Sequence, residues 1–421
     1  MYLGCIADDF TGATDLANNL VRAGMKVVQS IGIPDHAQKI EADAVVIALK
    51  SRTVLAEDAV LQSVEAAKWL LAHGAQQIYF KYCSTFDSTD EGNIGPVTDA
   101  LMDATGVDFT IACPAFPDNQ RTLFKGHLFV GNTLLSESGM RNHPLTPMTD
   151  SNLVRVLQRQ TRNTVGLIDY SMVAQGADAI SARIDALVRD GIRIAIVDAI
   201  SNEDLITMGK AFAGLKLVTG GSGIAVGLPR NWGISPNRES GRLPQASGGR
   251  AVISGSCSAA SNAQVKEFIA RGWPAYPIDP LEVANGADVI SRVLDWARPH
   301  LDAGPVLVYA TAEPEAVKAV QERLGVHEAG AMIERTLSAI AVGLVEGGVR
   351  QLVVAGGETS GACVQALDIT SMQIGEQIDP GVPWCFARSP RANGEGLHIT
   401  LKSGNFGTAD FFVKAFETLH E

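Results

Sequence analysis

Spacings that bind metals are missing from this sequence. Its six cysteines are scattered without a CxxC pair, and its eight histidines form no HxxxH or HxH pattern. We therefore expect neither structural zinc nor a histidine-based metal centre. Scattered cysteines in apolar or Gly/Ser-rich surroundings are typical of a reducing compartment, which predicts a cytoplasmic protein. Of the histidines, His127 and His143 are candidates for substrate contact, with a surface role as the alternative.

Positive charge is also in short supply, since the formal net charge is -12 at pH 7. Attraction to nucleic-acid phosphates or anionic lipid requires an excess of Lys and Arg on one surface, so neither partner is expected. An anionic small molecule is still possible as a ligand, because a pocket can be locally positive in an acidic protein. No stretch approaches the ~18 uninterrupted apolar residues of a membrane-spanning helix. Asp8 and Asp9 also interrupt the only N-terminal run that resembles a signal peptide.

Two nucleotide-binding fingerprints are absent as well. The sequence contains neither GxxxxGK[ST] nor GxGxxG. A P-loop and a dinucleotide fold are therefore not predicted, and a dehydrogenase is disfavoured. A nucleotide site in this chain has to be built from other glycine-rich loops.

The chain does have an ordinary globular composition, with 46% hydrophobic residues, 19% charged residues and 42 glycines. Its 421 residues exceed the ~250–300 at which single cores stop growing, so we expect two domains. Residues 229–250 are rich in Pro, Gly, Ser and Arg and lack an apolar period, which indicates a connecting segment. The predicted division is an N-terminal domain over 1–230, a linker over 231–250 and a C-terminal domain over 251–421.

Short apolar runs alternate with segments of helical periodicity in both halves. This alternation predicts an α/β fold of two three-layer domains with mostly parallel sheets. Residues 118–150 are too long for a plain connection and predict a hairpin or lid. The expected strands lie within residues 2–7, 43–52, 77–85, 109–117, 164–170, 192–200, 215–228, 250–258, 304–311, 349–361 and 396–407.

Polar clusters follow four successive strands of the N-terminal half, where parallel sheets bind ligands. The first is ADDFTG at residues 7–12. There, Asp8 and Asp9 are suited to order hydroxyl groups, to hold a cation or to take a proton from a hydroxyl. The alternative is that one of them caps the next helix. One aspartate can cap while the other acts.

Cations follow the next two strands. Arg52 comes after the second strand and Lys81 ends the third, and Arg can grip a carboxylate with two hydrogen bonds. Solvated loop charges are the alternative for both. The stretch 84–95 that follows is dense in hydroxyls and acids, so that Asp87 is suited to read a substrate hydroxyl. A plain capping turn would have a similar composition.

Three glycine-rich loops follow strands of the C-terminal half, at residues 254–258, 356–361 and 402–407. Backbone N–H groups and hydroxyls in such loops can bind phosphate, although each loop alone could be a tight turn. Together they predict nucleotide in the C-terminal domain, acceptor in the N-terminal domain and an active-site cleft between them. Glu358 is suited to help hold Mg²⁺, or is only a favourable charge at the start of a helix.

These motifs together resemble the four-carbon acid sugar kinase family, also described as DUF1537. Its N-terminal sugar-binding domain begins with DDxTG, and its C-terminal nucleotide-binding domain carries a GGxTS-type loop. The segments ADDFTGATDLAN, FKYCSTFDSTDEGNIGP, CPAFPDNQRT and AGGETSGA are most similar to the 3-oxo-tetronate kinase branch, and the resemblance covers essentially the whole chain. It implies ATP-dependent phosphorylation of the terminal (C4) hydroxyl of 3-oxo-tetronate, giving the 4-phosphate, in the catabolism of four-carbon sugar acids.

Carried over by motif, the resemblance implies site residues in both domains. Asp9 and Asp87 are the implied catalytic residues, and which of them acts as the base stays open. The residues implied for acceptor binding are Asp8, Arg52, Lys81 and Ser84. The residues implied for ATP binding are Ser256, Ser258, Gly356, Gly357, Glu358, Thr359, Ser360 and Gly404. Mg²⁺ is expected to arrive with ATP.

The sequence departs from the family at one point. Where many relatives read DSTLRGN, this chain reads DSTDEGN at residues 87–93, so Arg52 and Lys81 would have to supply the positive charge for the acceptor. Within the kinase class, D-threonate or D-erythronate is the alternative substrate, since these acids differ from 3-oxo-tetronate by one hydroxyl configuration or oxidation level. Outside that class, the alternative is a noncatalytic sensor of sugar acid and nucleotide. The expected partners are a small sugar acid and ATP. The oligomeric state stays open, with a homodimer among the options.

Overall fold

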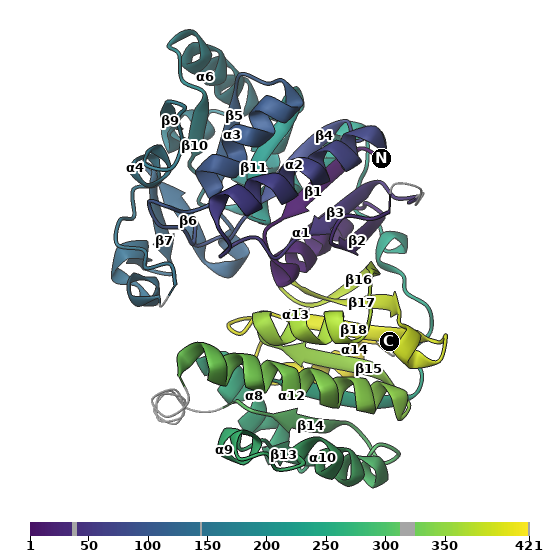
Figure 1. The fold of residues 1–421 in the computed structure, drawn as a ribbon. Helices are drawn as coiled ribbons and strands as arrows, with labels where there is room; N and C mark the ends of the chain where they lie inside the picture. The colour runs from purple at the N-terminus through teal and green to yellow at the C-terminus, as the bar shows by residue number, and fades with distance from the viewer. Residues whose placement is uncertain (36–39, 144, 312–324, 420–421) are drawn as a thin grey trace. The chain divides into compact units, whose positions relative to one another are not determined.

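The computed structural model describes residues 1–35, 40–143, 145–311 and 325–419 (Figure 1). The chain divides into two compact units, Met1–Gly241 and Arg242–Glu421. Both units are mixed α/β structures with a mostly parallel sheet, as the alternating pattern predicted. Within the described residues, no helix is long and apolar enough to cross a membrane.

The first unit is built on a parallel sheet. Its strands are β1 (Leu3–Ala7), β2 (Val27–Ile31), β3 (Ala44–Ala48), β4 (Gln77–Lys81), β5 (Thr110–Cys113), β9 (Val165–Ile168), β10 (Ile194–Val197) and β11 (Leu217–Gly220). They lie in the order β2-β3-β1-β4-β11-β5-β10-β9. Every residue of β1, β3 and β4 is buried, because parallel sheets are covered by helices on both faces.

The helices of this unit connect its strands. They are α1 (Phe10–Arg22), α2 (Ala56–Ala72), α3 (Ile94–Thr105), α4 (Leu153–Gln158), α5 (Tyr170–Val173), α6 (Ala177–Arg189) and α7 (Asn202–Ala211). Figure 1 shows α2 and α3 side by side on one face of the sheet.

The order of the strands in space brings distant parts of the chain to one sheet edge. β1 lies between β3 and β4, so that Ala7 is level with Ala48 on one side and with Lys81 on the other. On the far side of β4, Gly220 is level with both Lys81 and Cys113. The loops that leave these five strands therefore start at the same height, which is where the sequence predicted the acceptor site.

Residues 118–150 form the predicted hairpin and extend it into a small antiparallel sheet of β6 (Arg121–Phe124), β7 (His127–Val130) and β8 (Thr133–Leu134). Its first turn is fixed by the buried Asp198 at the end of β10. The carboxylate of Asp198 accepts hydrogen bonds from the backbone N–H groups of Lys125 at 2.6 Å and Gly126 at 2.8 Å. The hairpin is thereby anchored to the edge of the parallel sheet.

The second unit has the sheet order β13-β14-β12-β15-β18-β17-β16. Its strands are β12 (Gly249–Ser254), β13 (Ala275–Pro277), β14 (Val306–Tyr309), β15 (Val349–Ala355), β16 (Ser371–Asp379), β17 (Val382–Arg388) and β18 (Gly396–Lys402). The first five strands of this order, β13, β14, β12, β15 and β18, pair in parallel. Strand β17 pairs antiparallel with both β18 and β16. The described helices are α8 (Ala259–Ala270), α9 (Pro280–Ala284), α10 (Val289–Ala297), α12 (Val326–Glu346), α13 (Gly357–Ala366) and α14 (Phe411–Thr418).

The second unit has its own apolar core. Phe268 of α8 and the aromatic pair Phe411 and Phe412 of α14 pack on Val252 and Val353 of the sheet. Helices α12 and α13 pack against each other in front of the sheet in Figure 1. All seven residues of β15 are buried, which fits a strand covered on both faces.

Four strands of the structure were not predicted from the sequence, namely β2, β13, β16 and β17. Strand β2 reads VVQSI, in which two polar residues hide the apolar pattern. Their burial is supported by side-chain contacts from another element, since Gln29 accepts a hydrogen bond from Thr14 of α1 at 3.0 Å. Strand β16 mixes buried, half-buried and exposed residues over its nine positions without a regular period, so that no alternating pattern marks it in the sequence.

Candidate functional site

Asp8, Asp9 and Arg52 form one ion-pair cluster at the ends of β1 and β3. Arg52 donates from Nε to Asp8 Oδ2 at 2.9 Å and from Nη2 to Asp8 Oδ1 at 2.7 Å. Its Nη2 also reaches Asp9 Oδ1 at 2.6 Å. The Nε and Nη2 edge of Arg52, which was predicted to bind the acceptor, is therefore occupied by Asp8 of the same chain.

Asp9 is the N-cap of α1, which was the alternative to a substrate role in the sequence analysis. It accepts hydrogen bonds from the N–H of Gly12 at 3.1 Å and from the Thr11 hydroxyl at 2.9 Å. Burial works to raise the pKa of Asp9, but the charges of Arg52 and Lys81 outweigh it and hold the pKa below its usual value. A carboxylate with both oxygens occupied and a lowered pKa is poorly suited to take a proton. The geometry favours a positioning role for Asp9.

Lys81 stands at the centre of the site with no partner. The side chain is only 2% exposed, yet it makes no hydrogen bond or ion pair with any described residue. A β-carbon added to Gly12 would lie 2.8 Å from Lys81 Nζ and would also collide with the Asp9 carboxylate. Glycine at position 12 therefore lets the lysine approach the start of α1. The charge of Lys81 acts on Asp8, Asp9 and Asp15, and a buried lysine that makes no hydrogen bond of its own is an expected feature of an anion site.

Ser84 and Asp87 lie on the loop that follows Lys81. Asp87 accepts a hydrogen bond from Thr85 at 2.5 Å, and Ser84 is half-buried without a hydrogen bond to a described residue. Burial raises the pKa of Cys83 to about 11, and the charges of Asp87, Arg52 and Lys81 all act on this thiol. The structure thus brings these predicted acceptor residues around one point at the sheet edge.

The sequence analysis missed Asp15, Ser222 and Arg121, which belong to the same neighbourhood. Asp15 lies on α1 and accepts a hydrogen bond from the Ser222 hydroxyl at the end of β11, while its Oδ1 is buried without a partner. Burial raises the pKa of Asp15 to about 6, against the charges of Lys81 and Arg121. The signal in the sequence was the polar run TDLANN inside a helix whose buried face should be apolar.

Two of the predicted nucleotide loops are joined through the carbonyl of Gly404. This oxygen accepts hydrogen bonds from Ser258 Oγ at 2.6 Å, Ser261 Oγ at 3.1 Å and Lys402 Nζ at 2.8 Å. Ser256 Oγ donates to Ser258 Oγ at 3.2 Å. A β-carbon on Gly404 would lie 2.5 Å from the Ser256 hydroxyl, so that any other residue here would force the Ser256 side chain to move.

Lys402 has an internal role in this unit. It is fully buried, and its ammonium donates to the carbonyls of Ser403 at 3.0 Å, Gly404 at 2.8 Å and Phe406 at 3.0 Å. Burial lowers the pKa of Lys402 to about 7. With its hydrogen-bonding capacity directed to the loop 403–407, this lysine shapes the loop.

The third predicted loop forms the start of α13, beside the first two. The N–H groups of Gly357, Glu358 and Thr359 lie in the first helical turn, where they have no acceptor within the helix. Gly357 and Glu358 are exposed. Ser360 differs from the prediction, because it is fully buried, with its N–H bonded to Gly356 O at 2.8 Å and its hydroxyl facing Val354 O at 3.5 Å. Its polar groups are therefore directed into the fold.

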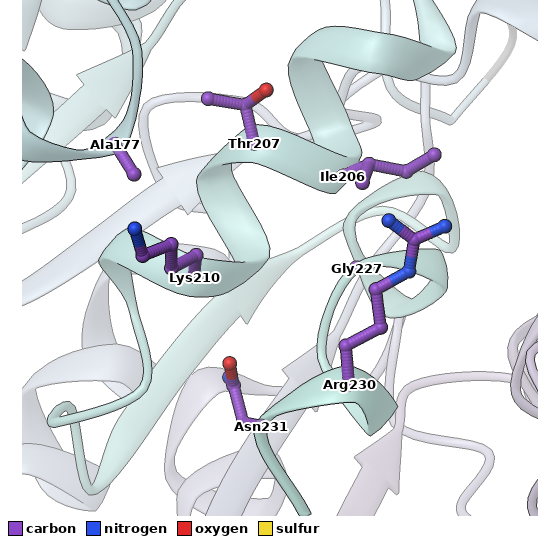
Figure 2. Close-up of a pocket in the computed structure, with 7 residues that line it drawn as sticks. All are labelled: Ala177, Ile206, Thr207, Lys210, Gly227, Arg230 and Asn231. Carbon is purple, nitrogen blue, oxygen red and sulfur yellow. The ribbon is translucent and has the colours of Figure 1, made fainter. Parts of the chain in front are cut away.

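Other candidate features lie apart from these clusters. Figure 2 shows a pocket of the first unit in which Lys210 of α7 and Arg230 line the cavity, and no predicted site residue contributes to it. His127 and His143 both make local hydrogen bonds within residues 118–150, to Lys125 O and from the Thr146 N–H. Within the described residues, no group of three or more His, Cys, Asp or Glu side chains is arranged to hold a metal.

Comparison with known proteins identifies both units. A sugar-binding N-terminal domain matches residues 3–228, and a nucleotide-binding C-terminal domain matches residues 251–412. The chain belongs to the four-carbon acid sugar kinase family. Within this family, the 3-oxo-tetronate kinase of Burkholderia multivorans is 59% identical over 99% of this chain and 97% of its own. The 3-oxo-tetronate kinase of Pseudomonas fluorescens is 57% identical, with the same coverage.

A solved structure of the family has the same fold. The Haemophilus influenzae protein of family DUF1537 is 43% identical and superposes with a TM-score of 0.80, covering 99% of this chain and all of its own. This chain and the solved structure therefore match over nearly their whole lengths. The matched N-terminal domain contains the strand-end cluster around Lys81. The matched C-terminal domain contains the three loops around Gly404.

Proposed function

We propose that this protein is an ATP-dependent kinase that transfers a phosphoryl group to the C4 hydroxyl of 3-oxo-tetronate. The observation that carries the proposal is the shared name of its full-length relatives, which are 46–59% identical to this chain. The unpartnered Lys81 in the sugar-binding unit supports an anionic acceptor. The N–H groups of α13 and the loops at Ser258 and Gly404 support a bound nucleotide.

The proposed chemistry is dominated by positioning and charge, as in other phosphoryl transfers. Lys81 would neutralise negative charge on the acceptor, and Asp9 would hold Arg52 and the start of α1 in place. Asp87 remains the proposed base among the residues first considered, because both oxygens of Asp9 are occupied. Transfer requires that the γ-phosphate reach the acceptor hydroxyl, so a cleft that brings both sites together stays a prediction.

Mg²⁺ is proposed as the second cofactor. Since no described cluster of side chains is arranged to hold a metal, the ion would be held mainly by ATP phosphates and water, with the exposed Glu358 as a candidate protein ligand. Mg²⁺ would neutralise charge on the transferred group. A cytoplasmic location, supported by six unpaired cysteines, and a homodimer both stay proposals.

A coupled assay of ADP production tests the proposal. Purified protein would be given ATP and Mg²⁺ with 3-oxo-tetronate, D-threonate or D-erythronate in separate reactions. The highest kcat/KM is expected for 3-oxo-tetronate. A higher kcat/KM for threonate or erythronate would identify that acid as the substrate instead. If none of the three acids led to ADP production, the noncatalytic sensor would be favoured.

A further inference from the structure

A four-carbon acid offers a carboxylate, and the site described so far provides no planar group to bind it. The two-pronged edge of Arg52 is occupied by Asp8, and DSTDEGN contains no arginine. Lys81 supplies a point charge, which attracts an anion but does not fix the plane of a carboxylate. A second cation with a vacant planar edge is therefore expected nearby.

Arg121 lies at the same sheet edge and has a fixed backbone. It is the first residue of β6, directly after the loop that leaves β5. Its N–H donates to Phe116 O at 3.0 Å, and its carbonyl accepts from Phe116 N–H at 2.8 Å. Phe116 is itself buried. The side chain of Arg121 is thus presented by a rigid turn, which is how precise binding groups are usually held.

The guanidinium of Arg121 is half used. Its Nη1 donates to the carbonyl of Asn119, within the same loop. Its Nε is buried and has no partner, and Nη2 makes no hydrogen bond to a described residue. Nε and Nη2 form the edge of a guanidinium that binds a carboxylate with two parallel hydrogen bonds. This edge of Arg121 therefore makes no hydrogen bond to a described residue.

Neighbouring cations of the unit are already paired. Arg22, which approaches the same loop, pairs with Asp118 at 3.5 Å, and Lys125 pairs with Asp169 at 3.1 Å. Arg121 has no carboxylate partner among the described residues, although its charge acts on Asp15 together with that of Lys81. The vacant edge thus belongs to the neighbourhood of Lys81.

Unpaired buried polar groups also belong to two residues linked to Arg121, namely Asn119, whose carbonyl accepts from Nη1, and Asp15, whose carboxylate feels the charge of Arg121. Besides its Nε, the Nδ2 of Asn119 and the Oδ1 of Asp15 are buried without partners. Each unsatisfied buried polar group costs free energy, so several in one neighbourhood are expected where a ligand completes them. Two donors and one acceptor match a molecule that carries both a carboxylate and hydroxyl groups.

We propose that the Nε and Nη2 edge of Arg121 binds the carboxylate of the acceptor, with Lys81 alongside, and so restricts the kinase to acids. The proposal rests on the proposed function. It predicts that the enzyme rejects the neutral ketose in which a hydroxymethyl group replaces the carboxylate. Removing the guanidinium should weaken the acid and leave the neutral compound almost unaffected.

The test compares wild type, Arg121→Gln and Arg121→Lys with 3-oxo-tetronate and with erythrulose, its neutral hydroxymethyl counterpart. For Arg121→Gln, kcat/KM for the acid should fall roughly 50-fold or more, mainly through KM, because two charge-assisted hydrogen bonds are lost. The value for erythrulose should stay within about three-fold, so the preference for the acid collapses. For Arg121→Lys, kcat/KM for the acid should lie between those of wild type and Arg121→Gln, since lysine keeps the positive charge but lacks the two parallel donors of the guanidinium.

Arg22→Gln is the matched control, because Arg22 approaches the same loop and already has a carboxylate partner. It should keep the wild-type preference. Where turnover of erythrulose is too slow to measure, the dissociation constants of the acid and of erythrulose, determined by calorimetry, give the same ratio. An equal loss for both compounds in Arg121→Gln, or an unchanged ratio, would overturn the proposal. If wild type does not phosphorylate 3-oxo-tetronate at all, the proposed function fails instead.

Discussion

Arg52 binds Asp8 through two parallel hydrogen bonds of 2.9 and 2.7 Å, across the ends of two neighbouring strands. The side chains of this pair are only 23% and 10% exposed. The arginine therefore bonds to two aspartates of its own chain at the start of α1. This pair stabilises the frame on which the proposed acceptor site is built.

Replacing Arg52 by Gln should destabilise the protein by about 3 kcal/mol, because it leaves a buried carboxylate without its partner. The free energy of unfolding in urea would measure the effect. Arg155→Gln is a matched control, since Arg155 binds Asp150 with the same atoms and the same two distances. Arg155 is 58% exposed and its charge is screened by water, so its loss should cost much less than the loss of Arg52. Equal costs for both variants would contradict the role assigned to burial.

Replacing Lys81 by Met should separate function from stability. Since Lys81 makes no hydrogen bond or ion pair with a described residue, and only its charge acts on nearby aspartates, the free energy of unfolding should fall less than in Arg52→Gln. The kcat/KM for the acid should fall roughly 100-fold, as for other single charged groups that stabilise a transferring anion. Steady-state kinetics and urea unfolding of the same preparation would show both results.

Lys402→Met is the contrasting variant, because Lys402 is also buried but bonded to three carbonyls. Its loss leaves those carbonyls unsatisfied and should cost about 2 kcal/mol. If Lys81→Met were the more destabilising of the two, the view of Lys81 as an unpaired ligand-binding group would be wrong.

Asp15 should give the protein an unusual pH dependence. Its pKa is about 6 in the folded protein, mainly through burial, against 3.8 in an unfolded chain. Between these values the folded state holds more protons, so this residue lowers stability as pH rises from about 4 to 6. Above pH 6 the full cost remains, about 3 kcal/mol for a shift of this size. Asp15→Asn should therefore gain stability relative to wild type between pH 4 and pH 7.5.

Asp150→Asn is the control of opposite sign. Hydrogen bonds from Arg155 lower the pKa of Asp150, so its stabilisation is present above the unfolded pKa and is lost as pH falls. Urea unfolding at pH 4, 5, 6 and 7.5 would measure both differences. An Asp15→Asn difference that stays constant over this range would refute the raised pKa.

Gly404→Ala should weaken ATP binding selectively. The added methyl group would collide with Ser256 Oγ, 2.5 Å away, and separate the two loops that meet at the Gly404 carbonyl. We expect KM for ATP to rise roughly 10-fold, about 1.4 kcal/mol, while KM for the acid stays near the wild-type value. Gly330→Ala is the control, because an added β-carbon there meets nothing within 4 Å. Equal increases in both KM values would point to a general loss of structure.

Much of this architecture was predictable because it depends on local patterns. Buried apolar runs alternating with helical periods indicated parallel sheets, and polar clusters after the runs indicated where ligands bind. Strands such as β2 were not predicted, because Gln29 and Ser30 are polar residues that are buried through contacts with other elements. The polar helix face around Asp15 was overlooked for the same reason.

The sequence by itself determined the α/β class, the residues at the strand ends and the family. Only the tertiary structure decided how those side chains are used. Arg52 meets Asp8 because β3 pairs with β1, and Ser360 turns into the fold because α13 starts where it does. The vacant edge of Arg121 likewise depends on which neighbours a guanidinium finds across the sheet edge. Hydrogen-bond partners from distant segments are set by strand order and register, which local sequence patterns do not contain.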